Sequence, residues 1–319
     1  SIIVNQVIQP RFRHTPVLVD EVCALMINER SGVYIDGTFG LGGHSKAISL
    51  LLNVDATLIG IDQDESALAQ FDPSLIKQTL HLRCTNFENL DQVLNDLKLT
   101  QVHGILLDLG LNSFSLDDPE RGFAFSLDGP LDMRFDRSND ITAETVINEY
   151  SQEQLADIMY RFGEERNSRR IARKIVSMRT NKRLTQIDEL REAVAGCVDP
   201  RFRNKSLARV FQAFRIEVNR EMDVLETVLN TATQVLTPGG RLAVISYHSL
   251  EDRMVKNHFR DLSQDIPQQP GMLESEIRIP LFKRITGKPV VATSEEAAVN
   301  PRARSAKLRV AERTLHASD

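Results

Sequence analysis

The sequence has 319 residues, of which 41% are hydrophobic and 26% are charged. A chain of this length and composition buries a substantial core, as one large domain or two smaller ones, so wholesale disorder is excluded. Its 39 basic and 44 acidic side chains give a formal net charge of −5, and this mild acidity by itself argues against a nucleic-acid partner.

The composition also predicts a cytoplasmic protein that does not associate with membranes. No apolar run approaches the roughly 18–20 residues of a membrane span, and residues 1–10 lack the basic start and apolar stretch of a signal peptide. Three cysteines, Cys23, Cys84 and Cys197, are odd in number and far apart. This spacing disfavours a disulfide framework and fits a reducing cytosol. We expect no metal site, and the sequence does not indicate an oligomeric state.

The first third of the chain alternates strand and helix patterns. Short apolar strands are predicted at 33–36, 57–62, 79–83 and 102–108, with helices at 20–27, 45–52, 65–71 and 87–97. Strands separated by helices pair in parallel, which predicts a doubly wound α/β sheet. Three of these strands end in Asp36, Asp62 and Asp108, so we expect the three carboxylates to share one edge of the sheet.

This alternation stops after Gly110. The segment 116–137 is rich in Gly, Pro and Asp, and residues 142–195 have a wholly helical pattern. Strand patterns resume at 241–246 and 306–310. The sequence therefore predicts an all-helical domain inserted into an α/β domain, with the inserted domain at 112–212 and the α/β domain at 1–111 and 213–319.

The net charge hides an uneven distribution. Residues 161–220 contain sixteen basic and seven acidic side chains, a local balance of +9, whereas the remainder carries −14. Ile171, Ile175 and Met178 recur at helical spacing, which predicts an amphipathic helix with a basic outer face. A solvated helix face explains one such cluster equally well. A second cluster favours a phosphate-binding surface; its members are Arg201, Arg203, Lys205, Arg209, Arg215 and Arg220.

A glycine-rich loop follows the first strand. Residues 36–44 read Asp-Gly-Thr-Phe-Gly-Leu-Gly-Gly-His, and glycines let the backbone turn tightly and let a ligand approach it. Asp62 ends the next strand, at the position where a carboxylate accepts hydrogen bonds from an adenosine ribose. The loop and Asp62 together predict an adenosine-bearing cofactor. A glycine turn without a ligand remains the alternative.

The loop distinguishes between adenosine cofactors. Ser45 stands where a dinucleotide loop has its third glycine, and Asp36 is placed to meet an ammonium group. S-adenosylmethionine, which has an amino-acid end and no phosphate, fits this loop better than a nicotinamide dinucleotide. A nicotinamide-dependent oxidoreductase stays open as a second reading.

Asp108, at the end of the fourth strand, is the predicted catalytic residue. An exocyclic amine of a base is a poor nucleophile because its lone pair is delocalised into the ring. A group that accepts its N–H localises the lone pair and aims it at a methyl donor. The cysteines are poorly placed for the thiolate mechanism of carbon methylation. His248 is a second candidate, as a proton shuttle, although a histidine in such a loop also serves to bond backbone.

Nine motifs in order resemble one family. They lie at residues 36–44, 104–110, 120–123, 128–134, 163–166, 211–219, 238–242, 246–253 and 300–305. The chain resembles the ribosomal RNA small-subunit methyltransferase H family, also called MraW, from His14 to about Arg313. The resemblance implies a class I methyltransferase Rossmann-like fold with an inserted helical domain. It also implies S-adenosyl-L-methionine-dependent methylation of the exocyclic 4-amino group of a cytidine in the decoding region of small-subunit rRNA.

The resemblance assigns cofactor contacts by position. These are Gly40, Gly42, Gly43, His44, Asp62, Phe87 and Asp108. One departure is at residues 109–117, where the family usually reads Leu-Gly-Val-Ser-Ser-x-Gln-Leu-Asp. The family's glutamine is Ser115 here, with a shorter reach. That departure keeps open a non-catalytic RNA-binding or ribosome-assembly factor on a methyltransferase scaffold.

Substrate contacts are expected on the inserted domain and beside the cofactor edge. Small-subunit rRNA, free or in an assembled subunit, is the expected partner, with the cytidine flipped into a pocket. Asp132 and Arg134 frame that base, or else form an ion pair that fixes their loop. The remaining expected contacts are Arg166, Arg169, Arg170, Arg253 and Arg302.

Overall fold

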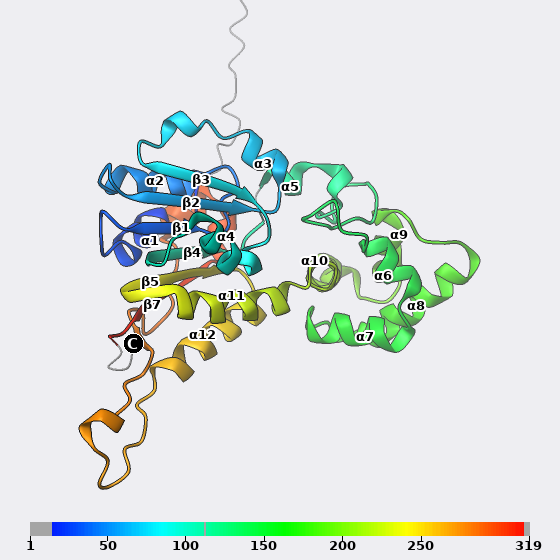
Figure 1. The fold of residues 1–319 in the computed structure, drawn as a ribbon. Helices are drawn as coiled ribbons and strands as arrows, with labels where there is room; N and C mark the ends of the chain where they lie inside the picture. Colours follow the sequence, from blue (N-terminus) through cyan, green and yellow to red (C-terminus); the bar gives the residue numbers. More distant parts are fainter. Residues whose placement is uncertain (1–14, 112, 316–319) are drawn as a thin grey trace, which may run out of the picture.

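The described part of the chain is built around one mixed sheet. The computed structural model describes residues 15–111 and 113–315, with the strand order β3-β2-β1-β4-β5-β7-β6 (Figure 1). The strands are β1 (Val33–Asp36), β2 (Thr57–Asp62), β3 (Thr79–Cys84), β4 (Val102–Asp108), β5 (Leu236–Ser246), β6 (Phe282–Arg284) and β7 (Lys307–Arg313). Strands β1 to β5 pair in parallel, and β7 is antiparallel to β5 and β6. This is the class I methyltransferase sheet, so the predicted Rossmann-like doubly wound fold is confirmed.

Helices cover both faces of the sheet. They are α1 (Val19–Met26), α2 (Gly43–Leu51), α4 (Leu90–Leu97), α11 (Glu221–Val235) and α12 (Ser249–Ser263). Neighbouring residues of a strand point to opposite faces, so Tyr34 packs with α1 and α2 while Ile35 packs with α4 and α11. Burial on both faces explains why β1, β2 and β4 are continuous apolar runs. Within the described ranges, no helix is both long and apolar enough to cross a membrane.

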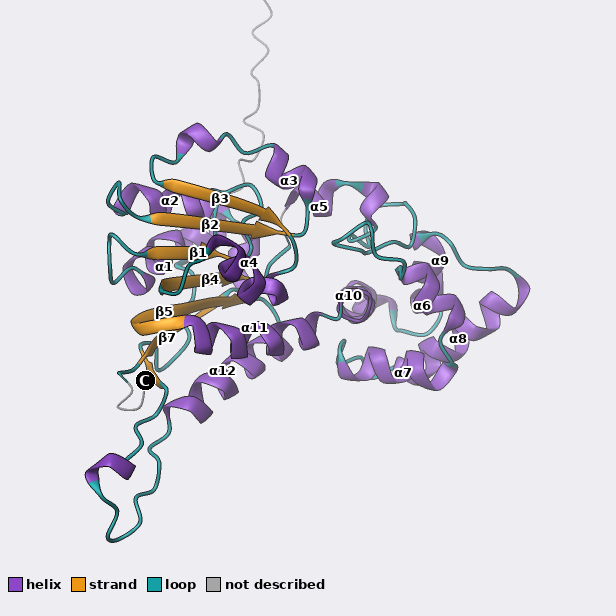
Figure 2. Cartoon of the chain, viewed as in Figure 1, coloured by secondary structure: helices purple, strands orange, loops and turns teal. Residues whose placement is uncertain are grey.

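A helical unit stands beside the sheet (Figure 2). Its main helices are α6 (Ala143–Glu149), α7 (Gln152–Arg161), α8 (Ser168–Asn181), α9 (Ile187–Ala195) and α10 (Arg203–Asn219). Thr142 and Ser151 cap α6 and α7 through reciprocal side-chain bonds, which satisfies free amides at both helix starts. The five helices share one apolar core that includes α10 as far as Val218. The predicted boundary at residue 212 lies inside α10.

The densest basic part of the chain, residues 161–183, covers the last residue of α7, a turn and α8, and is not one continuous helix. Helix α7 ends at Arg161 and α8 begins at Ser168. Between them, a Cβ on Gly163 would lie 2.6 Å from the Arg209 carbonyl oxygen, and Glu164 has a φ of 53°. This turn brings α7 and α8 side by side, and Ile171 and Ile175 are buried as predicted.

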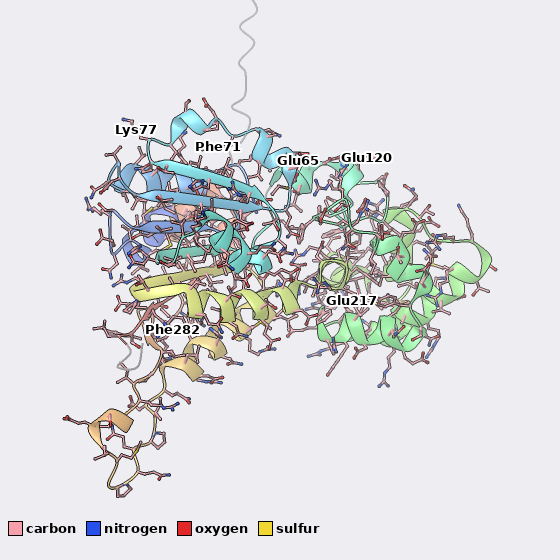
Figure 3. The ribbon with its side chains drawn as sticks, in the orientation of Figure 1. Glu65, Phe71, Lys77, Glu120, Glu217 and Phe282 are labelled. Atoms are coloured by element: carbon pink, nitrogen blue, oxygen red, sulfur yellow. The ribbon has the colours of Figure 1, made fainter. Side chains whose placement is uncertain are left out.

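Strand β6 was not predicted from the sequence. It has three residues, of which Lys283 and Arg284 are exposed, so no alternating pattern marks it. Its one buried side chain, Phe282, packs edge-on against Phe259 of α12 with ring centroids 5.7 Å apart (Figure 3). Pairing with β7 and this aromatic contact together hold the edge strand in place.

Candidate active site

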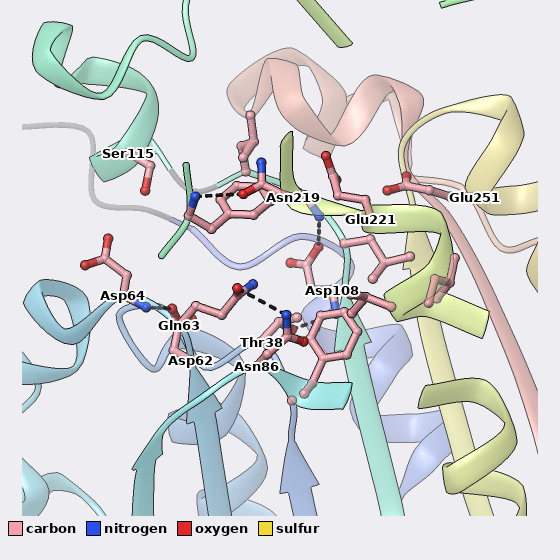
Figure 4. A pocket seen from close by; sticks show the side chains of 18 of the residues that line it. Thr38, Asp62, Gln63, Asp64, Asn86, Asp108, Ser115, Asn219, Glu221 and Glu251 are labelled. Carbon is pink, nitrogen blue, oxygen red and sulfur yellow. Dashed lines mark hydrogen bonds between the residues drawn. The ribbon is translucent and has the colours of Figure 1, made fainter. Parts of the chain in front are cut away.

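A pocket opens where the parallel strands end. Its walls come from the segments after β1, β2, β3 and β4, and from Ser115, Arg121, Phe135 and Asn219 of the helical side (Figure 4). The carboxyl ends of strands are where doubly wound sheets bind ligands, and this pocket lies at those ends. The pocket is therefore the candidate active site.

Asp62 lies at the base of this pocket, at the end of β2 (Figure 4). Its two carboxylate oxygens accept the N–H of Gly40 at 2.7 Å and the N–H of Asp64 at 2.8 Å. Burial raises the pKa of Asp62 to about 6 in spite of these two hydrogen bonds. The carboxylate is ionised at neutral pH and retains lone pairs for hydroxyl donors of a ligand.

The glycine loop shapes the pocket from behind. Gly42 has a φ of 81°, and a Cβ there would lie 2.5 Å from the ring of Phe71. Gly42 precedes α2, which begins at Gly43. Of the loop, Gly37 and Thr38 line the pocket, whereas the predicted Gly40, Gly42 and Gly43 do not. These three glycines form the turn behind the pocket wall, and Gly40 reaches the site through its bond to Asp62.

Asp108 is held at the opposite side of the pocket by its neighbours. Its backbone N–H donates to the Thr38 hydroxyl (2.7 Å), and its carboxylate accepts the Gly110 N–H (3.1 Å). The other carboxylate oxygen lies 3.8 Å from Nδ1 of His44. Nε2 of His44 donates to the Val17 carbonyl (2.7 Å), so the imidazole is fixed in that orientation. Two of these contacts, those with the Gly110 N–H and with His44, are made by the carboxyl group itself, and they pre-orient it without filling the pocket.

Buried groups behind Asp108 add to its surroundings. Burial and the adjacent Asp108 charge both raise the pKa of Tyr247, so this phenol remains protonated at all physiological pH values. The charge of Arg302, in the turn at 301–305, acts on the same phenol in the opposite direction. Asp36 is buried behind the loop, where desolvation raises its pKa and the Ser45 hydroxyl donates to it (2.7 Å). Asp36 does not line the pocket.

The other predicted cofactor contacts, Phe87 and Ser115, both line the pocket. Phe87 follows β3 and is half-buried against the apolar core, so only part of its ring faces the pocket. Ser115 is buried in the short helix α5 (Ser113–Asp117). Gln63 and Asn86, which the sequence analysis did not select, meet between these walls with a hydrogen bond of 3.3 Å (Figure 4).

The pocket is strongly acidic. Five carboxylates line it, and Arg121 is the one cationic side chain that the described residues place on its wall. The carboxylates belong to Asp62, Asp64, Asp108, Glu221 and Glu251. Arg121 and Glu251 lie in motifs that the sequence analysis quoted without giving these residues a role. Such a lining favours a ligand with cationic groups over a pyrophosphate.

Arg121 also joins the helical side to the cofactor edge. Its guanidinium lies 3.2 Å from the Asp64 carboxylate and donates to the carbonyls of Arg134 and Phe135. Arg121 is only 5% exposed. This buried ion pair couples the loop after β2 to the loop that enters the helical unit.

We expect Arg121→Met to lower the free energy of unfolding by about 3–5 kcal/mol, because Asp64 would keep a buried charge without its partner. Chemical denaturation measures this change. The matched control is Arg137→Met, which removes a half-exposed ion pair with Asp118 at 3.6 Å and is expected to cost less than about 1 kcal/mol. Equal costs for the two variants would contradict the role given to Arg121.

The second predicted catalytic residue and several predicted substrate residues have structural partners. Nδ1 of His248 accepts the Glu251 N–H (3.4 Å) and so caps α12, and His248 does not line the pocket. Asp132 and Arg134 form a two-bonded ion pair (2.8 and 3.0 Å) that holds their own loop. Arg253 is exposed and lies 3.6 Å from Glu164. Their roles toward a substrate stay predictions.

The basic surface is smaller than the residue count implies. Arg166, Arg169 and Arg170 are exposed at the start of α8, as expected. In contrast, Arg179 turns inward and donates to the carbonyls of Ile147 and Tyr150. Arg215 of the second cluster is largely buried against Glu221 (2.9 Å), so its assignment to a phosphate-binding surface is wrong.

Comparison with known proteins identifies the family. The profile of the MraW methylase family matches residues 11–314. The chain belongs to the MraW methylase family. It is 44% identical over 315 residues to Ribosomal RNA small subunit methyltransferase H of Prosthecochloris aestuarii, covering 94% of each chain. It is 40% identical over 311 residues to the protein of the same name from Caldicellulosiruptor saccharolyticus, covering 95% of this chain and 99% of that one.

The family match spans the sheet and the helical unit together, so both are parts of one methylase. Among solved structures, the chain aligns with an rRNA methylase from Streptococcus thermophilus at a TM-score of 0.37 and 12% identity, covering 93% and 94% of the two chains. That likeness is too distant to bear on the site.

Proposed function

We propose that this methylase transfers a methyl group from S-adenosylmethionine to the exocyclic 4-amino group of a cytidine in small-subunit ribosomal RNA. The observation that carries the proposal is the Asp108 carboxylate, pre-oriented in an acidic pocket at the carboxyl ends of the strands. The relatives named above are rRNA methyltransferases. Methylation of the decoding region, and action in the cytoplasm, belong to the same proposal.

The pocket fits S-adenosylmethionine. This cofactor supplies a methyl group made electrophilic by a sulfonium cation, and it carries no phosphate. The five lining carboxylates suit a cationic ligand, whereas a dinucleotide would place two phosphate charges among them. Asp62 is placed to accept the ribose hydroxyls, and Phe87 to pack against adenine. Thr38 and Gly37 line the side where the amino-acid end would lie.

In the proposed reaction, Asp108 orients the nucleophile. Its carboxylate accepts an N–H of the cytidine amine, which localises the nitrogen lone pair and directs it at the methyl carbon. The Gly110 N–H and His44 hold the carboxylate, so no reorientation is needed when the amine arrives. As the N–CH3 bond forms and the S–CH3 bond breaks, S-adenosylhomocysteine is the leaving group. The proton that the nitrogen loses passes to the Asp108 carboxylate, which already accepts that N–H, and from there to solvent.

Calorimetry separates this proposal from the oxidoreductase reading. We expect S-adenosylhomocysteine to bind and NAD to show no measurable binding at the same concentrations. Transfer of labelled methyl from S-adenosylmethionine to small-subunit rRNA then separates an enzyme from a non-catalytic RNA-binding or assembly factor. Binding of the cofactor without any transfer would favour the latter.

The raised pKa of Asp62 predicts a pH-dependent cofactor affinity. Its ionised form accepts the ribose hydroxyls, so affinity is expected to be constant above about pH 7 and to fall below pH 6 as the carboxyl takes up its proton. At the acidic end of this range, the affinity for the cofactor is expected to fall by about tenfold per pH unit. Titration calorimetry with S-adenosylhomocysteine between pH 5 and 8 measures this. Asp62→Asn is the control, and we expect it to bind S-adenosylhomocysteine more weakly, with an affinity that does not change between pH 5 and 8. A wild-type affinity that does not fall at acidic pH would contradict the role given to Asp62.

A further inference from the structure

A second groove lies next to the active-site pocket, on the far side of the start of α12. Leu250 and Arg253 line this groove, whereas Glu251, between them, lines the pocket. Its other walls belong to the helical unit, from the end of α7, the turn before α8 and the start of α10. The groove is open to solvent and has a volume of about 820 Å³, which is large enough for more than one nucleotide.

The groove is cationic. Its walls carry five cationic side chains, Arg161, Arg166, Lys205, Arg209 and Arg253, and two acidic ones, Glu164 and Glu165. Glu164 accepts the Ser249 hydroxyl (3.1 Å) and lies 3.6 Å from Arg253, while the buried Glu165 accepts the Asn167 N–H (3.1 Å) and lies 4.0 Å from Arg209. These two pairs leave the groove with an excess of positive charge. Arg166 and Lys205 form no ion pair with any residue in the described ranges, so their charges face the groove or solvent.

Two aromatic side chains stand exposed on the same groove. Tyr160, near the end of α7, is 66% exposed, and Phe202, in the turn before α10, is 51% exposed. Neither ring belongs to an apolar core, and the Arg201 guanidinium lies 5.5 Å from the centroid of the Phe202 ring. Aromatic faces set among phosphate-binding cations form the surface on which unpaired bases stack.

We infer that this groove binds unpaired nucleotides that flank the target cytidine, with Tyr160 and Phe202 stacking on their bases and the arginines and lysine holding phosphates. The inference rests on the proposed function. It places the flanking RNA across the start of α12, so that one nucleotide enters the pocket beside Glu251 while its neighbours stay in the groove. An acidic peptide would also meet the cations, but it would gain little from two flat aromatic faces.

Affinity for a single-stranded RNA oligonucleotide tests the stacking. Tyr160→Ala and Phe202→Ala are each expected to weaken binding about 5- to 150-fold, with the dependence of affinity on salt unchanged. Lys205→Ala is expected to weaken binding and also to lower the slope of log affinity against log salt by about one. Leu50→Ala, at a residue 80% exposed on α2, is the control with no expected effect. Unchanged affinity in both aromatic variants would overturn the inference.

The emission of a fluorescent variant reports on stacking of bases directly, because a purely structural role of the residue would not change this emission when RNA is added. The chain contains no Trp, so Phe202→Trp places a single indole in the groove and keeps the aromatic face. RNA is expected to quench its emission, and polyphosphate at equal charge to leave it unchanged. Equal quenching by RNA and by polyphosphate would show that the groove binds phosphate charge without stacking of bases, which would overturn the inference. If the wild-type protein methylates rRNA and the two aromatic variants have the same KM for rRNA as the wild type, the inference about the groove is wrong. If the wild-type protein does not methylate rRNA although RNA quenches the indole emission, the proposed function is wrong instead.

Discussion

Asp108→Asn is expected to lower kcat for methyl transfer by about 10²–10⁴-fold while cofactor affinity changes little. The asparagine oxygen can still accept the Gly110 N–H, so the turn after β4 should be kept. What is lost is the anionic acceptor that holds the amine and receives positive charge as the nitrogen is methylated. Single-turnover transfer of labelled methyl to rRNA measures the chemical step.

The same variant has clear controls. Its unfolding midpoint and its affinity for S-adenosylhomocysteine are expected to match those of the wild type, which separates chemistry from folding and cofactor binding. A kcat within about threefold of wild type would show that another group orients the amine. His248→Gln offers a comparison, because the imidazole caps α12 and lies off the pocket wall.

Gly42→Ala is expected to have the largest effect on the cofactor loop. The residue has a φ of 81°, and the added Cβ would meet the Phe71 ring at 2.5 Å. The left-handed backbone and the overpacking together should lower the free energy of unfolding by about 2–4 kcal/mol. Displacement of the loop should also weaken cofactor binding about tenfold or more. Denaturation and calorimetry measure the two effects.

A double-mutant cycle tests the cause of that cost. Gly42→Ala should cost less in a Phe71→Ala background, because the ring that the Cβ meets is gone. Gly287→Ala is the matched control, since a Cβ there meets nothing within 4 Å. A Gly42→Ala variant as stable as Gly287→Ala would contradict the packing described for this loop.

Much of the sheet can be predicted from the sequence because its signals are local. Strands β1, β2 and β4 are buried on both faces, so each is a short apolar run that ends in a carboxylate. Strand β6 lacks such a signal because long-range contacts hold it, namely its pairing with β7 and the packing of Phe282 against Phe259. The break between α7 and α8 likewise depends on Gly163 packing against Arg209, which lies 46 positions away in the sequence.

Some residues of the candidate site can also be predicted from the sequence, whereas others depend on long-range packing. Asp62 and Asp108 are predictable because strand ends converge at one edge of a parallel sheet. Three other residues of the pocket wall could not be predicted in this way: Arg121 and Asn219 of the helical side, and Glu221 at the start of α11. Their place on the wall depends on how α10 and α11 pack against each other and against the sheet. A count of basic residues overstates the basic surface, because tertiary packing pairs some of these residues with acids. Arg215 is one such residue, since the fold pairs it with Glu221.

Nucleoside mass spectrometry of small-subunit rRNA tests the central claim most directly. The rRNA comes from a strain that lacks the gene for this chain and from the same strain complemented with wild type or with Asp108→Asn. We predict that cytidine methylated on its 4-amino group falls in the deletion strain, returns with wild type and does not return with Asp108→Asn. An unchanged level of this nucleoside in the deletion strain would contradict the account.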